Sequence, residues 1–545
     1  MTLLSLILIP LLTAAAIAFA SARASRTLAL FGTLAAFAWS VVVAAAFDFG
    51  NTGADQFAAA WNWIPTLGLR LSLGADSVSL LLVLLTTLIM PLAVLGSFTA
   101  IRDREKEYFF WLLILEAAMI GVFLARDLIV FYTCFEFTLL PMYFLIAVYG
   151  SANRARAATV FFLYTFTGSM ITLAGLVYVA WWNWRLTGGW TFDIASLTAS
   201  AIEMSYGQQS IVLLALCCGF AVKVPLFPVH TWLPLAHTEA PTAGSVVLAA
   251  VLLKLGTYGL YRFALPMCPV AITEWSPVLA ILCIIGIVYG ALICWVQRDV
   301  KKLVAYSSVS HLGFCVLGLV ALNSIGVSGS IAYMINHGLS TGALFFLIGM
   351  VYERYHTRSI DELGGLARRM PVWTFFMVFF IMSSVALPGL NGFIGEFLAL
   401  VGAFVSGGAS DGELLPGRLG PWYAAVAGTG MILAAIYLLY LAGHVLFGPL
   451  RLPAPDAHGH HHHGAPLPRD LSGREITVLA PLAVLCVVLG VKPGLILDPI
   501  ETPVNDLTTD IFVEARAAGV YDDRVAEREP DLNEAFAARR EGGDR

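Results

Sequence analysis

The chain has 545 residues, of which 59% are hydrophobic and 12% are charged, and its formal net charge is −5. Soluble proteins carry about a quarter charged residues, and so few polar groups cannot cover a water-facing surface. The composition therefore predicts an all-α integral membrane protein, excludes a one-core soluble enzyme and gives no indication of a nucleic-acid partner.

A helix that crosses a bilayer needs about 20 mostly apolar residues. By that rule the sequence predicts about 14 transmembrane helices, near residues 2–20, 28–47, 76–99, 108–124, 128–149, 158–181, 210–235, 241–265, 276–296, 302–321, 328–351, 372–405, 421–447 and 475–493. The first run has the apolar core of a signal peptide. Because it lacks a basic start and further spans follow, we interpret it as the first membrane helix.

Lysine and arginine are distributed unevenly between the loops. Loops that follow odd-numbered spans hold about 17 lysines and arginines, and loops that follow even-numbered spans hold about 6. Loops rich in these residues stay on the cytoplasmic side of a membrane. This asymmetry predicts a multi-pass protein of the cell inner (plasma) membrane with both termini on the outer, periplasmic side.

Ionisable side chains stand in the middle of several predicted spans. Such groups are costly in a bilayer unless they are paired or hydrated, and they mark polar pathways. In chain order the strongest candidates for a proton relay are Glu136, Lys223, Lys254, His311, His337 and Glu396, and the weaker ones are Glu116, His230 and His237. We expect Glu136 to be the counter-charge of Lys223. By itself, His337 would fit a packing residue hydrogen-bonded to a neighbouring helix equally well.

Two predicted spans are interrupted. Pro225 and Pro228 follow Lys223 in span 7, and the stretch PGLNG at 388–392 precedes Glu396 in span 12. Broken helices at corresponding places in two halves are typical of inverted-repeat transporters. The pattern therefore predicts two inverted five-helix repeats, spans 4–8 and 9–13, with spans 7 and 12 discontinuous.

The domain organisation follows from these spans. We expect spans 1–3 in residues 1–107, the first repeat in 108–265, the second in 266–450, a His-rich cytoplasmic loop in 451–474, span 14 in 475–500 and a polar C-terminal extension in 501–545. The loop contains His458 and four further histidines at 460–463, but its Pro and Gly are typical of a linker rather than a metal site. The extension lacks a long apolar run, so we expect it to be loosely held.

The sequence contains no Walker loop, no dinucleotide fingerprint and no ligand pattern for haem or an iron–sulfur cluster. We therefore expect no cofactor and no metal in this chain. A pump built from it must take its energy from a partner or from an ion gradient.

Three runs resemble a known family: KVPLFPVHTWLPLAHTEAPTAGSVVLAAVLLKLGTYGLYR at 223–262, RDVKKLVAYSSVSHLGF at 298–314 and INHGLSTGALFFLIGMVYERYHTR at 335–358. They are similar to the antiporter-like, proton-pumping membrane subunits of respiratory complex I, and Mrp-type antiporters and membrane-bound hydrogenases share them. FEFTLLPMYFLIAVYG at 135–150 is similar to subunit M (mitochondrial subunit 4), and Glu396 stands where the related subunits L and N and the antiporters have lysine.

The resemblance implies a proton-translocating subunit of an NADH:quinone oxidoreductase that lies between subunits L and N in the lipid bilayer. FMN, iron–sulfur clusters and quinone would belong to partner subunits. It also implies a Glu136–Lys223 pair, a connecting Lys254, a hydrated axis through His311 and His337, and a terminal Glu396. An Mrp-type cation/proton antiporter subunit, a subunit of a hydrogenase or formate-oxidising complex, and a structural subunit without an ion path remain open alternatives.

Overall fold

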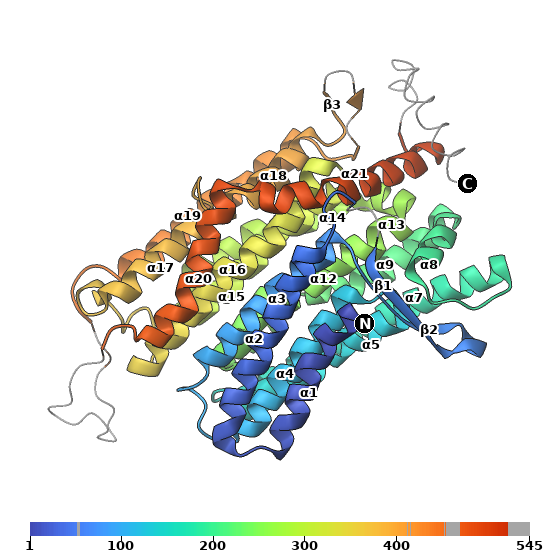
Figure 1. Cartoon of the computed structure of the whole chain (residues 1–545). Coiled ribbons are helices and arrows are strands. Elements are labelled where there is room, and N and C mark those ends of the chain that lie inside the picture. Colours follow the sequence, from blue (N-terminus) through green and yellow to red (C-terminus); the bar gives the residue numbers. More distant parts are fainter. Residues whose placement is uncertain (52–54, 411–412, 415, 452, 454–468, 522–545) are drawn as a thin grey trace.

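The computed structural model describes residues 1–51, 55–410, 413–414, 416–451, 453 and 469–521. This part of the chain is a bundle with 13 helices long and apolar enough to cross a membrane (Figure 1). The predicted span 12 is divided between two shorter apolar helices, Pro371–Ser384 and Asn391–Val405. The prediction of an all-α membrane protein with about 14 spans is confirmed.

The N-terminal layer contains three spans and a hairpin. The spans are α1 (Thr2–Phe19), α2 (Ala22–Ala46) and α3 (Ser77–Gly96). Between α2 and α3 lie β1 (Gln56–Ile64), a 3₁₀ turn at Pro65–Leu67 and β2 (Leu69–Ala75), and the two strands pair antiparallel. The sequence pattern did not indicate this hairpin, because neither strand faces a continuous core that would impose alternation on its residues.

The first repeat begins with α4 (Glu105–Leu124), and α5 (Leu128–Phe137) and α6 (Leu139–Tyr149) together form the next span. Then follow α7 (Arg154–Thr187), the short α8 (Ile194–Ile202) and a broken helix made of α9 (Tyr206–Lys223) and α10 (Trp232–Glu239). The last span, Thr242–Met267, is one continuous helix. It consists of α11 (Thr242–Val247), α12 (Leu253–Gly259) and α13 (Leu265–Met267), which are joined by π-helical turns at Leu248–Leu252 and Leu260–Ala264.

The second repeat has the same order of elements. It consists of α14 (Pro269–Val296), α15 (Val300–Val320), α16 (Ser324–Tyr355), the broken pair α17 (Pro371–Ser384) and α18 (Asn391–Val405), and α19 (Pro421–Val445). A 3₁₀ turn at Leu366–Arg368 precedes α17, and the short strands β3 (Ala409–Ser410) and β4 (Glu413–Leu414) follow α18. Because each repeat has five spans, the second starts from the opposite side of the membrane.

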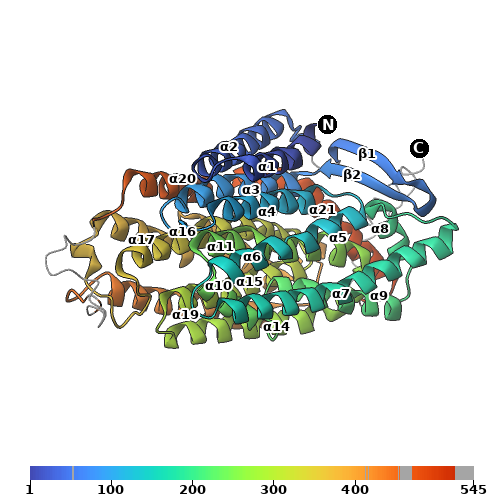
Figure 2. The ribbon, with the colours of Figure 1, turned by 90° about the horizontal axis from the view of Figure 1, so that it is seen from below.

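The interior of the bundle is formed by α11–α13, α15 and α16. Figure 2 shows α11, α15 and α16 between the layer of α1–α4 and the layer of α7, α14 and α19. In the most apolar stretches of α16 and of Thr242–Met267, every residue is buried inside the protein. In the corresponding stretches of α1, α7, α14 and α19, most residues are not buried. Polar side chains on the interior helices are therefore shielded from lipid.

After α20 (Gly473–Val491), residues 494–517 form a further helix, α21. The expectation of a loosely held extension from residue 501 is wrong for residues 501–517. α21 packs against α14 and α16 and buries Ile496, Ile500, Val504 and Ile511, which are spaced as one helical stripe. A narrow stripe of this kind needs no long apolar run. The remainder from 522, and the loop histidines at 458–463, lie outside the described residues.

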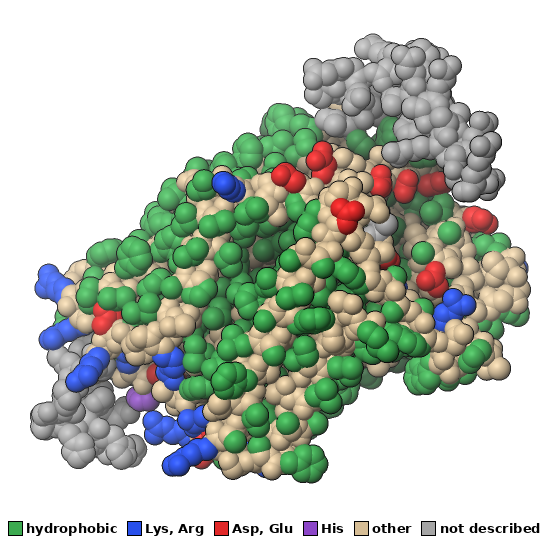
Figure 3. Space-filling model, viewed as in Figure 1, with side chains coloured by type: hydrophobic (Ala, Val, Ile, Leu, Met, Phe, Trp, Pro, Cys, Tyr) green, Lys and Arg blue, Asp and Glu red, His purple; other side chains and the backbone are tan. Residues whose placement is uncertain are grey.

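Charge is segregated along the molecule. Figure 3 shows Lys and Arg gathered at the end near α17 and the start of α20, and Asp and Glu mainly at the opposite end, near α21. Green apolar surface fills the band between them. This is the distribution that the positive-inside rule produces in a membrane protein.

Candidate functional site

Lys254 lies in the interior, on a helix that is irregular on both sides. α12 stands between two π-helical turns, and such turns are frequent at functional sites. The Lys254 ammonium donates to the carbonyl of Ala249 inside the first π turn. Its Nζ also lies 2.7 Å from Nδ1 of His337 on α16. Lys254 has no exposed surface, so these buried partners decide whether its charge is tolerated.

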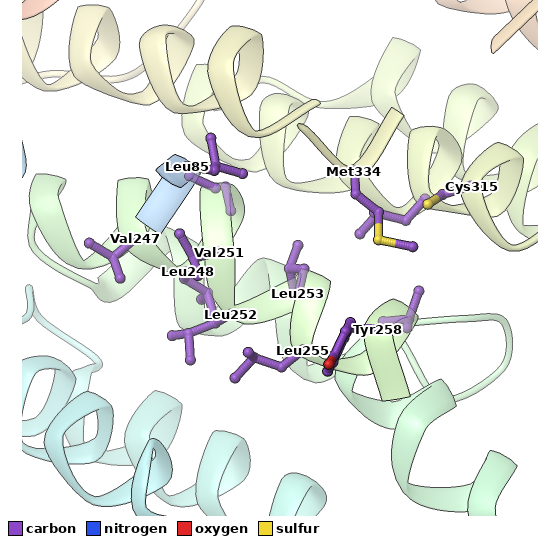
Figure 4. Close-up of a cluster of buried hydrophobic side chains, with 14 of the residues drawn as sticks. Leu85, Val247, Leu248, Val251, Leu252, Leu253, Leu255, Tyr258, Cys315 and Met334 are labelled. Atoms are coloured by element: carbon purple, nitrogen blue, oxygen red, sulfur yellow. The ribbon is translucent and has the colours of Figure 1, made fainter. Parts of the chain in front are cut away.

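The surroundings of Lys254 are otherwise apolar. Figure 4 shows its chain neighbours Leu253 and Leu255 in a cluster of buried side chains that also includes Leu85, Val251, Tyr258 and Met334. Such packing excludes water except along polar side chains. Among the side chains around Lys254, His337 is therefore the titratable group that it contacts directly.

A second group of polar side chains surrounds His311 on α15. Its Nδ1 lies 2.8 Å from Oε1 of Glu396 on α18 and 2.7 Å from the hydroxyl of Tyr333 on α16. Tyr333 also donates to Glu396. On the other edge of the ring, Nε2 of His311 lies 3.2 Å from the hydroxyl of Tyr437 on α19. All four side chains are buried, so this is a hydrogen-bonded cluster inside the second repeat, in which Oε2 of Glu396 alone of the carboxylate oxygens has no partner among the described residues.

The two groups adjoin one another. The ring centres of His311 and His337 are 6.0 Å apart, too far for a direct hydrogen bond and near enough for one bridging water. Lys254, His337, His311 and Glu396 therefore form one line from the last span of the first repeat to the broken helix of the second. The structure brings together these four predicted residues from α12, α16, α15 and α18.

The break between α17 and α18 is held by a pair of asparagines. Asn336 on α16 donates to the carbonyl of Asn391 at 2.7 Å, and Asn391 donates back to the carbonyl of Asn336 at 3.1 Å. Ser383, at the end of α17, donates to the side-chain oxygen of Asn391 at 2.6 Å. Non-helical backbone at membrane depth persists only where its polar groups are satisfied inside the protein, and these side chains satisfy them one turn from Glu396.

The predicted ion pair between Glu136 and Lys223 is not formed in this structure. Lys223 instead donates to Oγ1 of Thr138 at 3.2 Å and lies over the ring of Phe135. Glu136 is only partly buried, and its Oε1 has no hydrogen-bond partner. Glu136 and Thr138 are two residues apart and do not lie on the same face of a helix, but the charges of Glu136 and Lys223 still act on each other.

The weaker candidates lie apart from the central line. Glu116 on α4 is completely buried, and neither carboxylate oxygen has a hydrogen-bond partner. His230, in the break after α9, packs its ring between Phe227 and Tyr289. His237 on α10 stacks on Phe345 with ring centres 4.6 Å apart, and neither ring nitrogen has a partner. The charges of Lys254 and Lys301 both act on His237.

A polar cavity of about 600 Å³ opens near the C-terminal end of α10, on the side of the basic loops. Its lining includes Glu239, Lys301, Glu353, His356 and Arg358. At its inner wall Lys301 donates to the carbonyl of Ala240, and Ser151 donates to Glu239 at 2.6 Å. Glu239 is two residues from His237, so the cavity reaches to within one helical turn of it.

The sequence interpretation missed several of these residues. Tyr333 could have been found, because it precedes His337 by four residues and therefore shares its helix face. Lys301 was counted among the loop charges although it is buried in the first turn of α15. Thr138, Tyr437 and Glu239 carry no signal in the sequence, since their roles depend on contacts between distant segments.

A network of ion pairs ties the outer ends of several elements together. Asp76, the N-cap of α3, lies 2.7 Å from Arg262 and 3.5 Å from Arg126, and Asp55 pairs with both arginines. Burial by itself would raise the pKa of Asp76, but the two arginines and the hydrogen bonds from Ser79 lower it to about 2. The network fixes the β1–β2 hairpin to the bundle.

No group of three or more His, Cys, Asp or Glu side chains among the described residues is arranged to hold a metal ion. The titratable side chains on the central line face one another rather than a common point. The arrangement can pass protons between adjacent groups.

Comparisons with known proteins agree with this geometry. The pattern of the family described as "NADH:quinone oxidoreductase/Mrp antiporter, TM" matches residues 125–409. NADH-quinone oxidoreductase subunit M of Rhodobacter capsulatus is 41% identical over 94% of this chain and 97% of its own. NADH-ubiquinone oxidoreductase chain 4 of Arabidopsis thaliana is 40% identical over 89% and 92%. A chain of respiratory complex I from Thermus thermophilus superposes with a TM-score of 0.80 at 29% identity, covering 94% of this chain and all of its own.

Proposed function

Because the chain belongs to the NADH:quinone oxidoreductase/Mrp antiporter family of transmembrane proteins, we propose that it is the proton-translocating subunit M of an NADH:quinone oxidoreductase. The observation that carries the proposal is the buried line Lys254–His337–His311–Glu396, which joins the two repeats. So many titratable groups are costly inside a membrane unless they are paired or hydrated, and buried groups of this kind mark ion and proton pathways. The relatives that match nearly the whole chain have this name.

Protons are taken up through the cavity on the side of the basic loops. They pass from its inner wall, at Glu239 and Lys301, by way of His237 to Lys254. They then move through His337 and His311 to Glu396, which stands beside the second helix break and delivers them to the other side. The distances between successive groups on the central line support this order.

The energy for this transfer comes from redox chemistry in partner subunits, where FMN, iron–sulfur clusters and quinone are bound. Neighbouring antiporter-like subunits L and N flank this chain in the membrane. A charge movement passed on by one of them changes the position of Lys223 relative to Glu136, and Lys223 then passes its proton toward Lys254. Glu116 and His230 assist from positions outside the central line.

The orientation and domain division are part of the proposal. The basic end of the molecule (Figure 3) faces the cytoplasm, and both termini face the periplasm across the cell inner membrane. Residues 1–107 form the N-terminal spans, 108–265 and 266–450 the two repeats, 451–474 a cytoplasmic loop, 475–500 span 14 and 501–545 an outer extension.

The test is the proton uptake of inverted membrane vesicles that contain the intact complex and are energised with NADH. Lys254→Met retains length and removes the titratable group, and we expect it to reduce proton uptake at least about tenfold. NADH oxidation by a hydrophilic artificial acceptor should be unchanged, because that reaction does not use the membrane arm. Lys492→Met, on an exposed lysine after α20, is the matched control. Normal proton uptake by Lys254→Met would overturn the proposal.

An Mrp-type antiporter subunit would have the same helices but different partners. Isolation of the chain from its native membrane distinguishes the two, since the proposal requires co-purifying subunits that oxidise NADH. Recovery with small membrane proteins alone would favour the antiporter.

A further inference from the structure

Lys223 contacts the junction of α5 and α6 on a face that Glu136 does not share. Its Nζ lies 3.2 Å from Oγ1 of Thr138 and 4.9 Å from the ring centre of Phe135. Thr138 has helical backbone angles, so Phe135 and Thr138, three residues apart, lie on one side of a continuous turn. Glu136 is directed to another side.

The environment of the Lys223 ammonium is suited to a positive charge. Thr138 donates its own hydroxyl hydrogen to the carbonyl of Phe135 at 2.7 Å, so its oxygen presents lone pairs to the lysine. The face of the Phe135 ring attracts a cation. Lys223 is also the last residue of α9, where the helix terminus carries partial negative charge. Thr138 and Phe135 are both buried, which strengthens these interactions.

Glu136 offers the same lysine a second position. Its Oε1 is buried and has no hydrogen-bond partner in the part of the chain that the structure describes, although the residue as a whole is only partly buried. The lysine side chain is a flexible four-carbon stem. The charge of Glu136 acts on Lys223, so Glu136 is the carboxylate available to a lysine that leaves Thr138.

We propose that Thr138, with Phe135, forms a resting cradle for Lys223 and is a positioning residue that keeps the ammonium away from Glu136 between pumping events. This inference rests on the proposed function. Thr138 thereby determines how readily Lys223 forms and leaves its pair with Glu136, and so the rate at which each cycle starts.

The inference makes the hydroxyl of Thr138 important and its methyl group unimportant. Thr138→Val keeps the shape and removes the hydroxyl, whereas Thr138→Ser keeps the hydroxyl and removes the methyl. In the vesicles described above we expect Thr138→Val to lower proton uptake about threefold to tenfold, the range for the net loss of one ordinary hydrogen bond. Thr138→Ser should remain within about twofold of the unmodified complex. Thr133→Val, on the exposed side of α5, is the control for the helix.

Which of the two variants lowers proton uptake more distinguishes a positioning role of Thr138 from a packing role. A merely structural role would make the cavity-forming Thr138→Ser the more harmful change and leave the isosteric Thr138→Val near normal, and that result would overturn the inference. Equal uptake by both variants and the unmodified complex would overturn it too. Lys223→Ala is measured beside them. Full pumping by Lys223→Ala would contradict the proposed role of Lys223, whereas loss of pumping there with a normal Thr138→Val would contradict the Thr138 inference alone.

Discussion

Lys254 and His337 are directly hydrogen-bonded across the boundary between the two repeats, with Nζ and Nδ1 2.7 Å apart. A charged lysine can only donate, so Nδ1 of His337 is the acceptor while Lys254 holds its proton. The ring hydrogen of His337 then belongs to Nε2, which has no hydrogen-bond partner in the described part of the chain. In the proposed relay, transfer of a proton from Lys254 to His337 gives an imidazolium that can release its other hydrogen from Nε2.

The first prediction concerns Tyr333, which hydrogen-bonds both His311 and Glu396. Tyr333→Phe keeps the ring and removes the shared hydroxyl, so we expect NADH-driven proton uptake to fall about tenfold, as for one lost bond to a charged group. Tyr437→Phe removes the longer contact to the other edge of His311 and should have the smaller effect. If Tyr437→Phe were the more damaging variant, the assignment of Tyr333 to the relay would be wrong.

The second prediction tests the uptake route through His237. His237→Gln retains polar atoms but cannot accept and release a proton near neutral pH, so proton uptake should fall about fivefold or more while the complex still assembles. His356→Gln, at the exposed mouth of the same cavity, is the matched control and should be normal. Equal uptake rates for the two variants would show that protons bypass His237.

The third prediction concerns the pH dependence of stability. Burial raises the pKa of Asp76, but the charges of Arg262 and Arg126 outweigh burial and lower the pKa to about 2. The pKa of an aspartate in an unfolded chain is about 3.9. A lowered folded pKa means that the stabilisation is present above about pH 4 and is lost as the pH falls from 4 through 2. Thermal unfolding in detergent should therefore show a steep loss over this window, and the loss should be smaller in Asp76→Asn.

At pH 7 the Asp76→Asn variant should itself be less stable, because Arg126 and Arg262 lose a buried counter-charge. Breaking a buried pair from one side costs about 3 kcal/mol. Glu274→Gln, which interrupts the half-exposed pair with Arg418, should cost under about 1 kcal/mol. Similar unfolding temperatures for the two variants would contradict a stabilising role of the Asp76 network.

The fourth prediction concerns the asparagine pair at the second helix break. Asn391→Ala removes the bonds to Asn336 and Ser383 and leaves buried polar groups unsatisfied, at a cost of about 2 kcal/mol. Because the break lies beside Glu396, proton uptake should fall together with the unfolding temperature. Asn336→Ala removes the reciprocal bond to the carbonyl of Asn391 and should lower both as well. An unchanged unfolding temperature in both variants would contradict a stabilising role of the asparagine pair.

The sequence was sufficient to identify the membrane class, the spans and most of the residues of the proposed relay. Lys254, His311, His337 and Glu396 could be selected because ionisable groups in 20-residue apolar runs mark polar pathways by default, and several of them occur together. The two breaks could be located because proline and glycine interrupt helices through local geometry. Residues 501–517 were misjudged, because a helix that buries only a narrow stripe has no long apolar run.

What the sequence determined by itself is thus the type of each residue and its depth along a helix, since both follow from local composition and a fixed rise per residue. Which side chains meet was decided by the tertiary structure alone. Lys223 contacts Thr138 rather than Glu136, and Tyr333 joins His311 to Glu396, because the rotation of each helix about its axis is set by packing against its neighbours. A hydrogen bond tolerates only a few tenths of an ångström, and no single segment contains the information that fixes such a distance between two helices.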